Sequence, residues 1–274
     1  MEGRRVAFSG LVWGWVLAAA GAAAVAQSGV PADRFAPGEI VMLRLTDIQT
    51  RFSEPVRATA TPLPAELGGI SIVLRQLGGP ERPLPLLAIE QDGAVTRVLA
   101  QVPFELFIPP PGSLAPVGPS LLIPQEGGAP RDPVRFMAAA DNLRVVAITH
   151  ADGALATPAS PARAGEVLVV YLLGMGHTAP RVASGVPSPS PPAVVAPPQA
   201  MFDFGSSSAP ATPSFAGLSP GSVGLYQVNV TVPQPPENLA PCVPEANATL
   251  RLAGRASEAA AAVCIDPLIR RQLE

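Results

Sequence analysis

A serine between two glycines is the first pattern that could carry chemistry. Residues 217–221 read Gly-Leu-Ser-Pro-Gly and match the G-x-S-x-G turn that exposes the nucleophile in many serine hydrolases. In that turn the backbone N–H after the serine stabilises the oxyanion, but Pro220 follows Ser219 and has no N–H. A helix should come next, whereas residues 223–232 have the pattern of a strand. We therefore interpret this segment as a turn before a strand.

A hydrolase would also need a base, and the chain has two histidines, His150 and His177. His150 precedes an Ala-Asp-Gly turn sequence, and His177 follows a strand-like segment, so both are predicted to lie in loops. A secreted serine hydrolase that uses Ser219, His177 and a carboxylate is the alternative function to be tested. Two isolated histidines make a poor metal site.

Two glutamates, Glu39 and Glu166, could act as the paired carboxylates of glycoside hydrolysis. Each follows a glycine at the same point of an internal repeat, so we expect them to do one structural job twice by accepting N–H bonds of their turns. Four aspartates lack the dense loop pattern that binds calcium: Asp33, Asp47, Asp132 and Asp203. The sequence thus predicts no catalytic residues, no metal ligands and no cofactor.

The chain has two cysteines, Cys242 and Cys264, and a bridge between them would close a loop of about 22 residues worth roughly 3 kcal/mol. In an oxidising compartment such a pair tends to form a disulfide. A metal site would need further ligands, and two buried free thiols are the other alternative.

The N-terminus has the pattern of a secretory signal. Arg4 and Arg5 precede a long apolar run, and residues 24–26 supply an Ala-Val-Ala cleavage site, so cleavage is expected between Ala26 and Gln27. An uncleaved anchor is the alternative, because the uncharged stretch is long enough to span a bilayer.

Composition favours strands. Of 274 residues, 48% are hydrophobic and 14% are charged, which allows a sizeable core, while 35 prolines suit short strands and turns better than helices. The formal net charge of −3, without a basic patch, argues against nucleic-acid binding.

The two halves of the chain repeat each other. Gly-Glu followed by a β-branched apolar run occurs at residues 38–43 and again at 165–171, and similar strands ending in Val-Pro occur at 98–103 and 228–233. A spacing of about 127 to 130 residues is that of duplicated domains. Further strands are expected at 69–74, 85–89, 134–138, 143–148, 201–204, 248–252 and 261–265.

Short alternating strands between turns predict an all-β chain of two tandem β-sandwich domains after an N-terminal signal helix. The Pro-rich residues 187–198 are interpreted as an extended surface excursion, and the serine-, proline- and alanine-rich stretch before residue 162 as the linker. The predicted divisions are a signal peptide (1–26), a short N-terminal segment (27–35), a first sandwich (36–149), a linker (150–161), a second sandwich (162–266) and a tail (267–274).

Several segments together resemble the Solibacter-type C-terminal domain family of secreted acidobacterial proteins, a family without an assigned activity. They are residues 37–41, 63–72, 100–106, 160–167, 215–221 and 223–230. The resemblance implies paired immunoglobulin-like units, similar to those of transcription-factor and plexin (IPT) type, and it brings no catalytic residues. Residues 75–82 and 121–132 depart from the family pattern, which leaves the last strands of the first domain less defined.

These observations predict an exported, non-catalytic module located in the periplasm, at the cell surface or outside the cell. Its expected partner is an unknown protein or glycan; no nucleic acid is expected, and the membrane is contacted only if the signal segment stays uncleaved. An architectural spacer without a ligand is a further alternative.

Overall fold

The structure is a computed structural model of the chain and describes residues 34–109, 119–243 and 246–267. The predicted signal helix, the cleavage site between Ala26 and Gln27 and the tail from residue 268 lie outside this part. The described part is built of strands and turns and contains no helix. Accordingly, it offers no helix long and apolar enough to cross a membrane.

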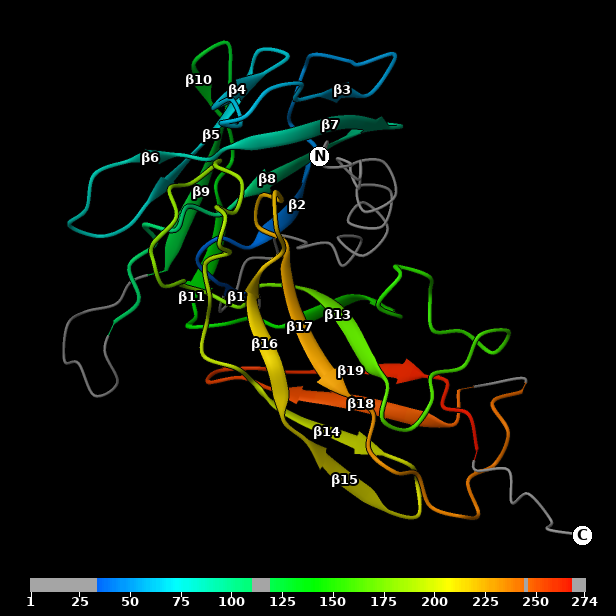
Figure 1. Ribbon diagram of the computed structural model, residues 1–274. Coiled ribbons are helices and arrows are strands. Elements are labelled where there is room, and N and C mark those ends of the chain that lie inside the picture. Colours follow the sequence, from blue (N-terminus) through cyan, green and yellow to red (C-terminus); the bar gives the residue numbers. More distant parts are fainter. Residues whose placement is uncertain (1–33, 110–118, 244–245, 268–274) are drawn as a thin grey trace, which may run out of the picture.

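The chain folds into two tandem immunoglobulin-like β-sandwiches, which Figure 1 shows one above the other. One sheet of the first sandwich has the order β2-β8-β7-β3, and the other has the order β1-β11-β9-β5-β4 with β10 on β9 and β6 on β5. The bounds of these strands are β1 Arg34–Phe35, β2 Ile40–Leu45, β3 Val56–Arg57, β4 Glu66–Leu67, β5 Ile70–Arg75, β6 Arg82–Pro83, β7 Leu86–Asp92, β8 Val95–Gln101, β9 Ser120–Glu126, β10 Ala129–Pro130 and β11 Val134–Ala138.

The second sandwich packs a sheet of order β12-β13-β17-β16 on a sheet of order β15-β14-β18-β19. Its strands are β12 Arg144–Thr149, β13 Val167–Leu173, β14 Gln199–Asp203, β15 Ser208–Ala211, β16 Pro213–Leu218, β17 Tyr226–Thr231, β18 Ala248–Ala253 and β19 Glu258–Val263. The pairings within both sheets are antiparallel.

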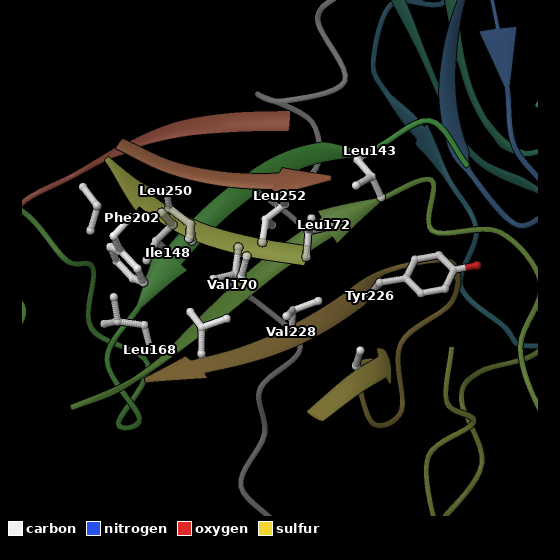
Figure 2. Close-up of a cluster of buried hydrophobic side chains, with 14 of the residues drawn as sticks. Leu143, Ile148, Leu168, Val170, Leu172, Phe202, Tyr226, Val228, Leu250 and Leu252 are labelled. Carbon is white, nitrogen blue, oxygen red and sulfur yellow. The ribbon is translucent and has the colours of Figure 1, made fainter. Parts of the chain in front are cut away.

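Period-2 alternation places the core of the second sandwich. In β17 the side chains of Tyr226, Val228 and Val230 are buried, while Gln227 and Asn229 between them are half-buried. The buried residues of β13 and β17 face those of β14 and β18 across the sandwich (Figure 2). Each such aliphatic side chain contributes about 1.5–3 kcal/mol when it is fully buried, so this alternation fixes which face of each sheet turns inward.

Two strands differ from the sequence expectation. The strand expected at 143–148 was assigned to the first sandwich, but β12 pairs with β13 in the second. Residues 121–132 looked irregular, yet β9 runs through them between β5 and β11 despite Pro124. Alternation predicts that a segment is a strand but does not name its partner, which explains the misassignment of β12.

The Pro-rich stretch 187–198 is more than a surface excursion, so that interpretation was wrong in part. Ala193 is fully buried in the core of the second sandwich. Val194 forms β-bridges with Ala179 on one side and with Gly217 of β16 on the other. The stretch therefore covers the edge of β16.

A packed junction joins the two sandwiches. Six buried apolar residues meet there: Ile40, Leu87, Ala88, Leu99, Leu173 and Leu225. Phe104, from the first half of the chain, belongs to the core of the second sandwich. Backbone and side-chain hydrogen bonds add to this contact, such as Leu63 N–H to Gly185 O (2.9 Å) and Gly185 N–H to Gln101 Oε1 (2.6 Å).

Gly174 lets the chain close at this junction. Its φ of 75° lies in the left-handed region, and a Cβ on it would fall 2.1 Å from the backbone oxygen of Asn142. The N–H of Asn142 donates to Gly174 O at 2.7 Å, so the two backbones are held together at this point.

We expect Gly174→Ala to lower the free energy of unfolding by roughly 3 kcal/mol, from the φ cost and the clash together. Gly221→Ala is the matched control: its φ is 70°, and its added Cβ would meet no described atom within 4 Å, so it should lose only about 1 kcal/mol. Urea unfolding of both variants measures the difference. Equal losses would mean that the junction tolerates the extra carbon.

Candidate functional site

The Gly-Glu turn of each sandwich uses its glutamate in the same way. The Oε2 atom of Glu39 accepts the N–H of Ala36 at 2.8 Å, and Oε2 of Glu166 accepts the N–H of Arg163 at 2.9 Å. The expectation that these carboxylates accept turn N–H bonds is confirmed. Each glutamate thereby satisfies a donor that the turn would otherwise leave without a partner.

The glycine of each turn has a positive φ and ties its turn to a neighbouring strand end. Gly38 N–H donates to Val102 O, and Gly165 N–H donates to Val232 O, both at 2.9 Å. The repeat seen in the sequence is therefore a repeat of backbone hydrogen bonds as well.

The second oxygen of Glu39 points into the junction. Its Oε1 accepts from Asn142 Nδ2 at 2.9 Å and lies 3.4 Å from a guanidinium nitrogen of Arg144. The Glu39 side chain is fully buried, and this burial, opposed by Arg144, raises the pKa of its carboxyl to about 7.

The second oxygen of Glu166 meets a histidine instead. Its Oε1 lies 2.5 Å from Nδ1 of His150, and because a carboxylate only accepts, Nδ1 carries the proton. The hydrogen bond from Glu166 raises the pKa of His150. Burial would raise the pKa of Glu166, but the bonds from His150 and Arg163 outweigh it and hold that pKa below its usual value.

Ser160 contacts the other side of the His150 ring, so that a serine, a histidine and a glutamate lie in a row. Its Oγ lies 3.2 Å from Nε2 of His150, and its carbonyl oxygen lies 3.0 Å from the same nitrogen. This is the order of groups in a serine-hydrolase triad. No sequence motif indicates this set, because the three residues lie in the β12–β13 connection and at its end without a recognisable spacing.

Neither backbone position at Ser160 offers a free N–H for acyl transfer. The N–H of Ser160 donates to Thr157 O at 3.0 Å, and Pro161 has no N–H. When His150 is protonated, its Nε2–H can donate to the carbonyl of Ser160 rather than serve as a base. The protonation of His150 can therefore control how the loop is held. The backbone N–H groups of residues 160 and 161 cannot stabilise an oxyanion at Ser160.

These groups line an open depression of about 630 Å³ at the end of the second sandwich where β12 ends and β13 begins. Its charged side chains are His150, Asp152, Arg163, Glu166 and Asp266. Three of these five are carboxylates, and Arg163 lies 3.8 Å from Asp266. The depression suits a small cationic group.

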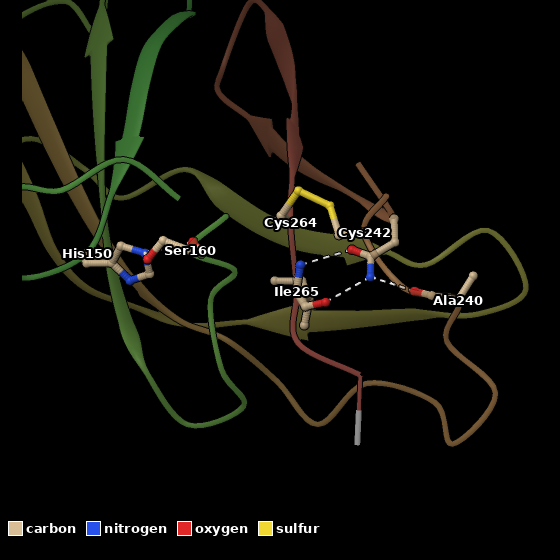
Figure 3. Close-up of a disulfide and its surroundings, with 7 residues drawn as sticks. His150, Ser160, Ala240, Cys242, Cys264 and Ile265 are labelled. Atoms are coloured by element: carbon tan, nitrogen blue, oxygen red, sulfur yellow. Dashed lines mark hydrogen bonds between the residues drawn. A yellow bond between two sulfur atoms is a disulfide. The ribbon is translucent and has the colours of Figure 1, made fainter. Parts of the chain in front are cut away.

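The disulfide lies close in the sequence to Asp266, which lines this depression. Cys242 and Cys264 are bonded, with their Cα atoms 5.4 Å apart. Figure 3 shows the disulfide with Ala240 and Ile265 beside it. The amide of Asn247 accepts from Ile265 N–H at 2.9 Å and donates to the carbonyls of Ile265 and Ala240 at 2.8 and 2.7 Å. The chain leading to Asp266 is thus fixed from two sides.

The alternative hydrolase set, Ser219 with His177, is not joined by any hydrogen bond among the described residues. Ser219 lies in the turn between β16 and β17, where its N–H donates to Leu225 O at 2.8 Å. His177 lies beside a smaller depression of about 160 Å³, and its Nε2 is 2.7 Å from the carbonyl of Phe104. A carbonyl only accepts, so this nitrogen carries a proton and is not a free base.

The described residues hold no group of three His, Cys, Asp or Glu side chains placed to bind a metal ion.

The two glutamates should differ in their contribution to stability. We expect Glu39→Ala to cost roughly 3 kcal/mol, because it leaves the buried N–H of Ala36 unpaired and removes the carboxylate that Asn142 and Arg144 contact. Glu166→Ala should cost about 1 kcal/mol, because water can reach the partners that it leaves. Urea unfolding of the two variants at one pH compares them, and equal costs would contradict the difference in burial.

The His150–Glu166 pair should stabilise the fold only within a pH window. A raised His150 pKa gives stability that is complete below about pH 6.5 and is lost as the pH rises through the folded-state pKa. A lowered Glu166 pKa gives stability that is present above about pH 4.5 and is lost as the pH falls through the folded-state pKa.

A double-mutant cycle of His150→Gln and Glu166→Gln should therefore give a coupling of about 1 kcal/mol near pH 5.5 and little near pH 9. Unfolding free energies of the four proteins at both pH values provide the measurement. A coupling that is the same at both would show that the contact does not depend on the histidine proton.

Comparisons with known proteins add little to this geometry. No protein-family model matches the sequence, and no curated protein matches it. Among solved structures, the chain is similar to bovine butyrophilin (11% identity, 87% of this chain and 97% of that one, TM-score 0.23). It is also similar to titin A168–A169 (9%, 86% and 94%, TM-score 0.21). A third is the pullulanase of Anoxybacillus sp. LM18-11 (7% identity, TM-score 0.20), and 85% of this chain covers 27% of it. With such low scores, the fold is established by the sheet pairings described above.

Proposed function

We propose that this chain is an exported, non-catalytic module in which two β-sandwiches are held in one orientation and present their loops to a protein or glycan. The observation that carries the proposal is the junction, where a fully buried Glu39 is satisfied by Asn142 and Arg144 at the start of the second sandwich. A rotation of one sandwich against the other would expose that carboxylate to water or remove its hydrogen-bond donors, at a cost of several kcal/mol. Binding residues are disproportionately found on loops that a rigid scaffold positions, and the fixed junction provides such a scaffold.

Export is supported by the signal pattern of residues 1–26 and by the disulfide, which persists in oxidising compartments. The membership that fits these properties is the Solibacter-type family of secreted proteins, on the segments quoted above. The strand pairings favour a boundary between the sandwiches near residues 139–143, with the loop 150–161 belonging to the second sandwich.

A hydrolase is the second candidate, because Ser160 contacts His150 and His150 contacts Glu166, as in a catalytic triad. The proposal favours binding over catalysis because the backbone donor of Ser160 is already used and that of residue 161 does not exist. Ser160 therefore serves as a loop contact of His150.

The proposal predicts that the exported chain, residues 27–274, retains one or more partners from a panel of cell-wall glycans and secreted proteins in a pull-down. Gly174→Ala, which disturbs the junction, should weaken retention of a partner that contacts both sandwiches, whereas Gly221→Ala should not. Failure to retain any member of the panel would contradict the binding role and favour the spacer.

The same chain should not be labelled by a fluorophosphonate, and its hydrolysis of p-nitrophenyl esters should equal that of Ser160→Ala. Labelling or turnover that Ser160→Ala abolishes would overturn the non-catalytic assignment. Loss on Ser219→Ala alone would point instead to the alternative hydrolase that uses Ser219 and His177.

A further inference from the structure

The carboxyl group of Glu39 lies between the two sandwiches and is covered from both. Its own turn supplies the N–H of Ala36, whereas Asn142 and Arg144 approach it from the start of the second sandwich. Just after β13, a Cβ on Gly174 would fall 3.3 Å from the carboxyl carbon, so the second sandwich also closes over the group. The side chain of Glu39 is fully buried as a result.

Among the residues that the structure describes, two titratable side chains act electrostatically on this carboxyl group. Arg144 of β12 lies 3.4 Å from Oε1 and favours the ionised form. Tyr226 of β17 donates its hydroxyl to Gly176 O, and burial raises its pKa, so it stays neutral. Burial outweighs the attraction of Arg144 and raises the pKa of Glu39 to about 7. The group therefore changes its charge near neutral pH.

Separation of the sandwiches would return this carboxyl group to water. The N–H of Ala36 would stay with Glu39, because both belong to the first sandwich, while Asn142, Arg144 and the cover at Gly174 would move away. In water the group ionises near its ordinary pKa of 4.5, whereas in the closed junction it keeps its proton up to about pH 7. The closed junction thus binds the proton more tightly than the open one does.

This difference makes the opening of the junction depend on pH. Below about pH 4.5 both states are protonated, and opening is least favourable. Between about pH 4.5 and 7 only the closed state keeps the proton, so each pH unit favours opening by up to about tenfold. Above about pH 7 both states are ionised, and the dependence ends. Phe104 and the buried apolar residues of the junction hold it closed throughout, so ionisation changes how often it opens and leaves the resting arrangement unchanged.

We propose that Glu39 makes the junction a proton-controlled joint, which is held most tightly while the carboxyl group is protonated and opens more often once the group is ionised. Arg144 remains beside the ionised group as its counterion and limits the loosening. The two sandwiches therefore resist separation most in a mildly acidic medium. The inference concerns the joint itself and holds whether or not the module binds a partner.

Hydrogen exchange of backbone amides, followed by NMR on residues 27–274, tests the proposal. The reporters are the amides of Leu63 and Gly185, whose hydrogen bonds cross the junction. Their protection factors, which are corrected for the intrinsic exchange rate, should fall by about ten- to hundredfold from pH 5 to pH 7. The amides of Val98 and Val228, in the central strands β8 and β17, should be better protected at both pH values, because the sandwiches stay folded when the joint opens.

Two matched glutamate variants assign the effect. Glu39→Gln keeps the size of the side chain and cannot ionise, so the protection of the reporters should no longer change between pH 5 and pH 7. Glu166→Gln, at the equivalent position of the second turn, should keep the full change. Arg144→Gln covers the case in which Glu39→Gln does not fold: without the guanidinium, the pKa of Glu39 rises further, and the loss of protection should move to higher pH. Carbon-13 NMR of the Glu39 carboxyl group follows the same shift directly.

Four results would overturn the proposal. The reporters could keep the same protection at pH 5 and pH 7, or they could lose it equally in Glu39→Gln. They could also be as well protected as Val98 and Val228, which would mean that the junction opens only when a whole sandwich unfolds. The last is a Glu39 carboxyl group that titrates near pH 4.5, because the closed junction would then hold no extra proton.

Discussion

A carboxylate without access to water must be surrounded by hydrogen-bond donors, and Glu39 imposes this requirement at the centre of the molecule. Its two oxygens are met by the turn before it and by residues more than a hundred positions later, where the second sandwich begins. Because Arg144 is the first residue of β12, satisfying Glu39 also fixes where the second sandwich starts. Gly174 must be a glycine so that the backbone of Asn142 can come close enough. The buried carboxyl group of Glu39 and its partners thus contribute to the relative placement of the two halves, together with the apolar junction.

The same local structure acquires different chemistry when its surroundings change. The turns at Glu39 and Glu166 share their glycine conformation, their strand contacts and their N–H acceptor role. Burial raises the pKa of Glu39 to about 7, whereas its half-exposed counterpart is held below its usual pKa by His150 and Arg163. The repeated turn therefore provides two carboxylate sites: packing buries one of them at the junction and leaves the other facing a polar depression.

The sequence revealed the parts that depend on local pattern. The valines of β17 and the two Gly-Glu turns were predicted, because alternation and the glycine conformation are properties of neighbouring residues. The partner of β12 was not, since alternation does not state which strand lies alongside. The contact of Ser160 with His150 was missed for a related reason: it arises from a loop that folds back through bridges at Thr149–Leu155 and Thr157–Ser160. No spacing rule describes that loop. The G-x-S-x-G motif pointed to Ser219 instead, but the N–H of Ser219 bonds to Leu225 O, and His177 bonds to Phe104 O.

Low aromatic content makes the placement of the few large rings important. Phe104 leaves the first sandwich to enter the core of the second, and Tyr226 of the second donates its hydroxyl to Gly176 O at 2.5 Å beside the junction. Both rings thus make contacts at or across the junction, while aliphatic side chains make up most of the two cores. A rotation of one sandwich against the other would have to withdraw Phe104 from its apolar site as well as uncover Glu39, and these costs act together. The loops of the two sandwiches consequently keep a constant separation.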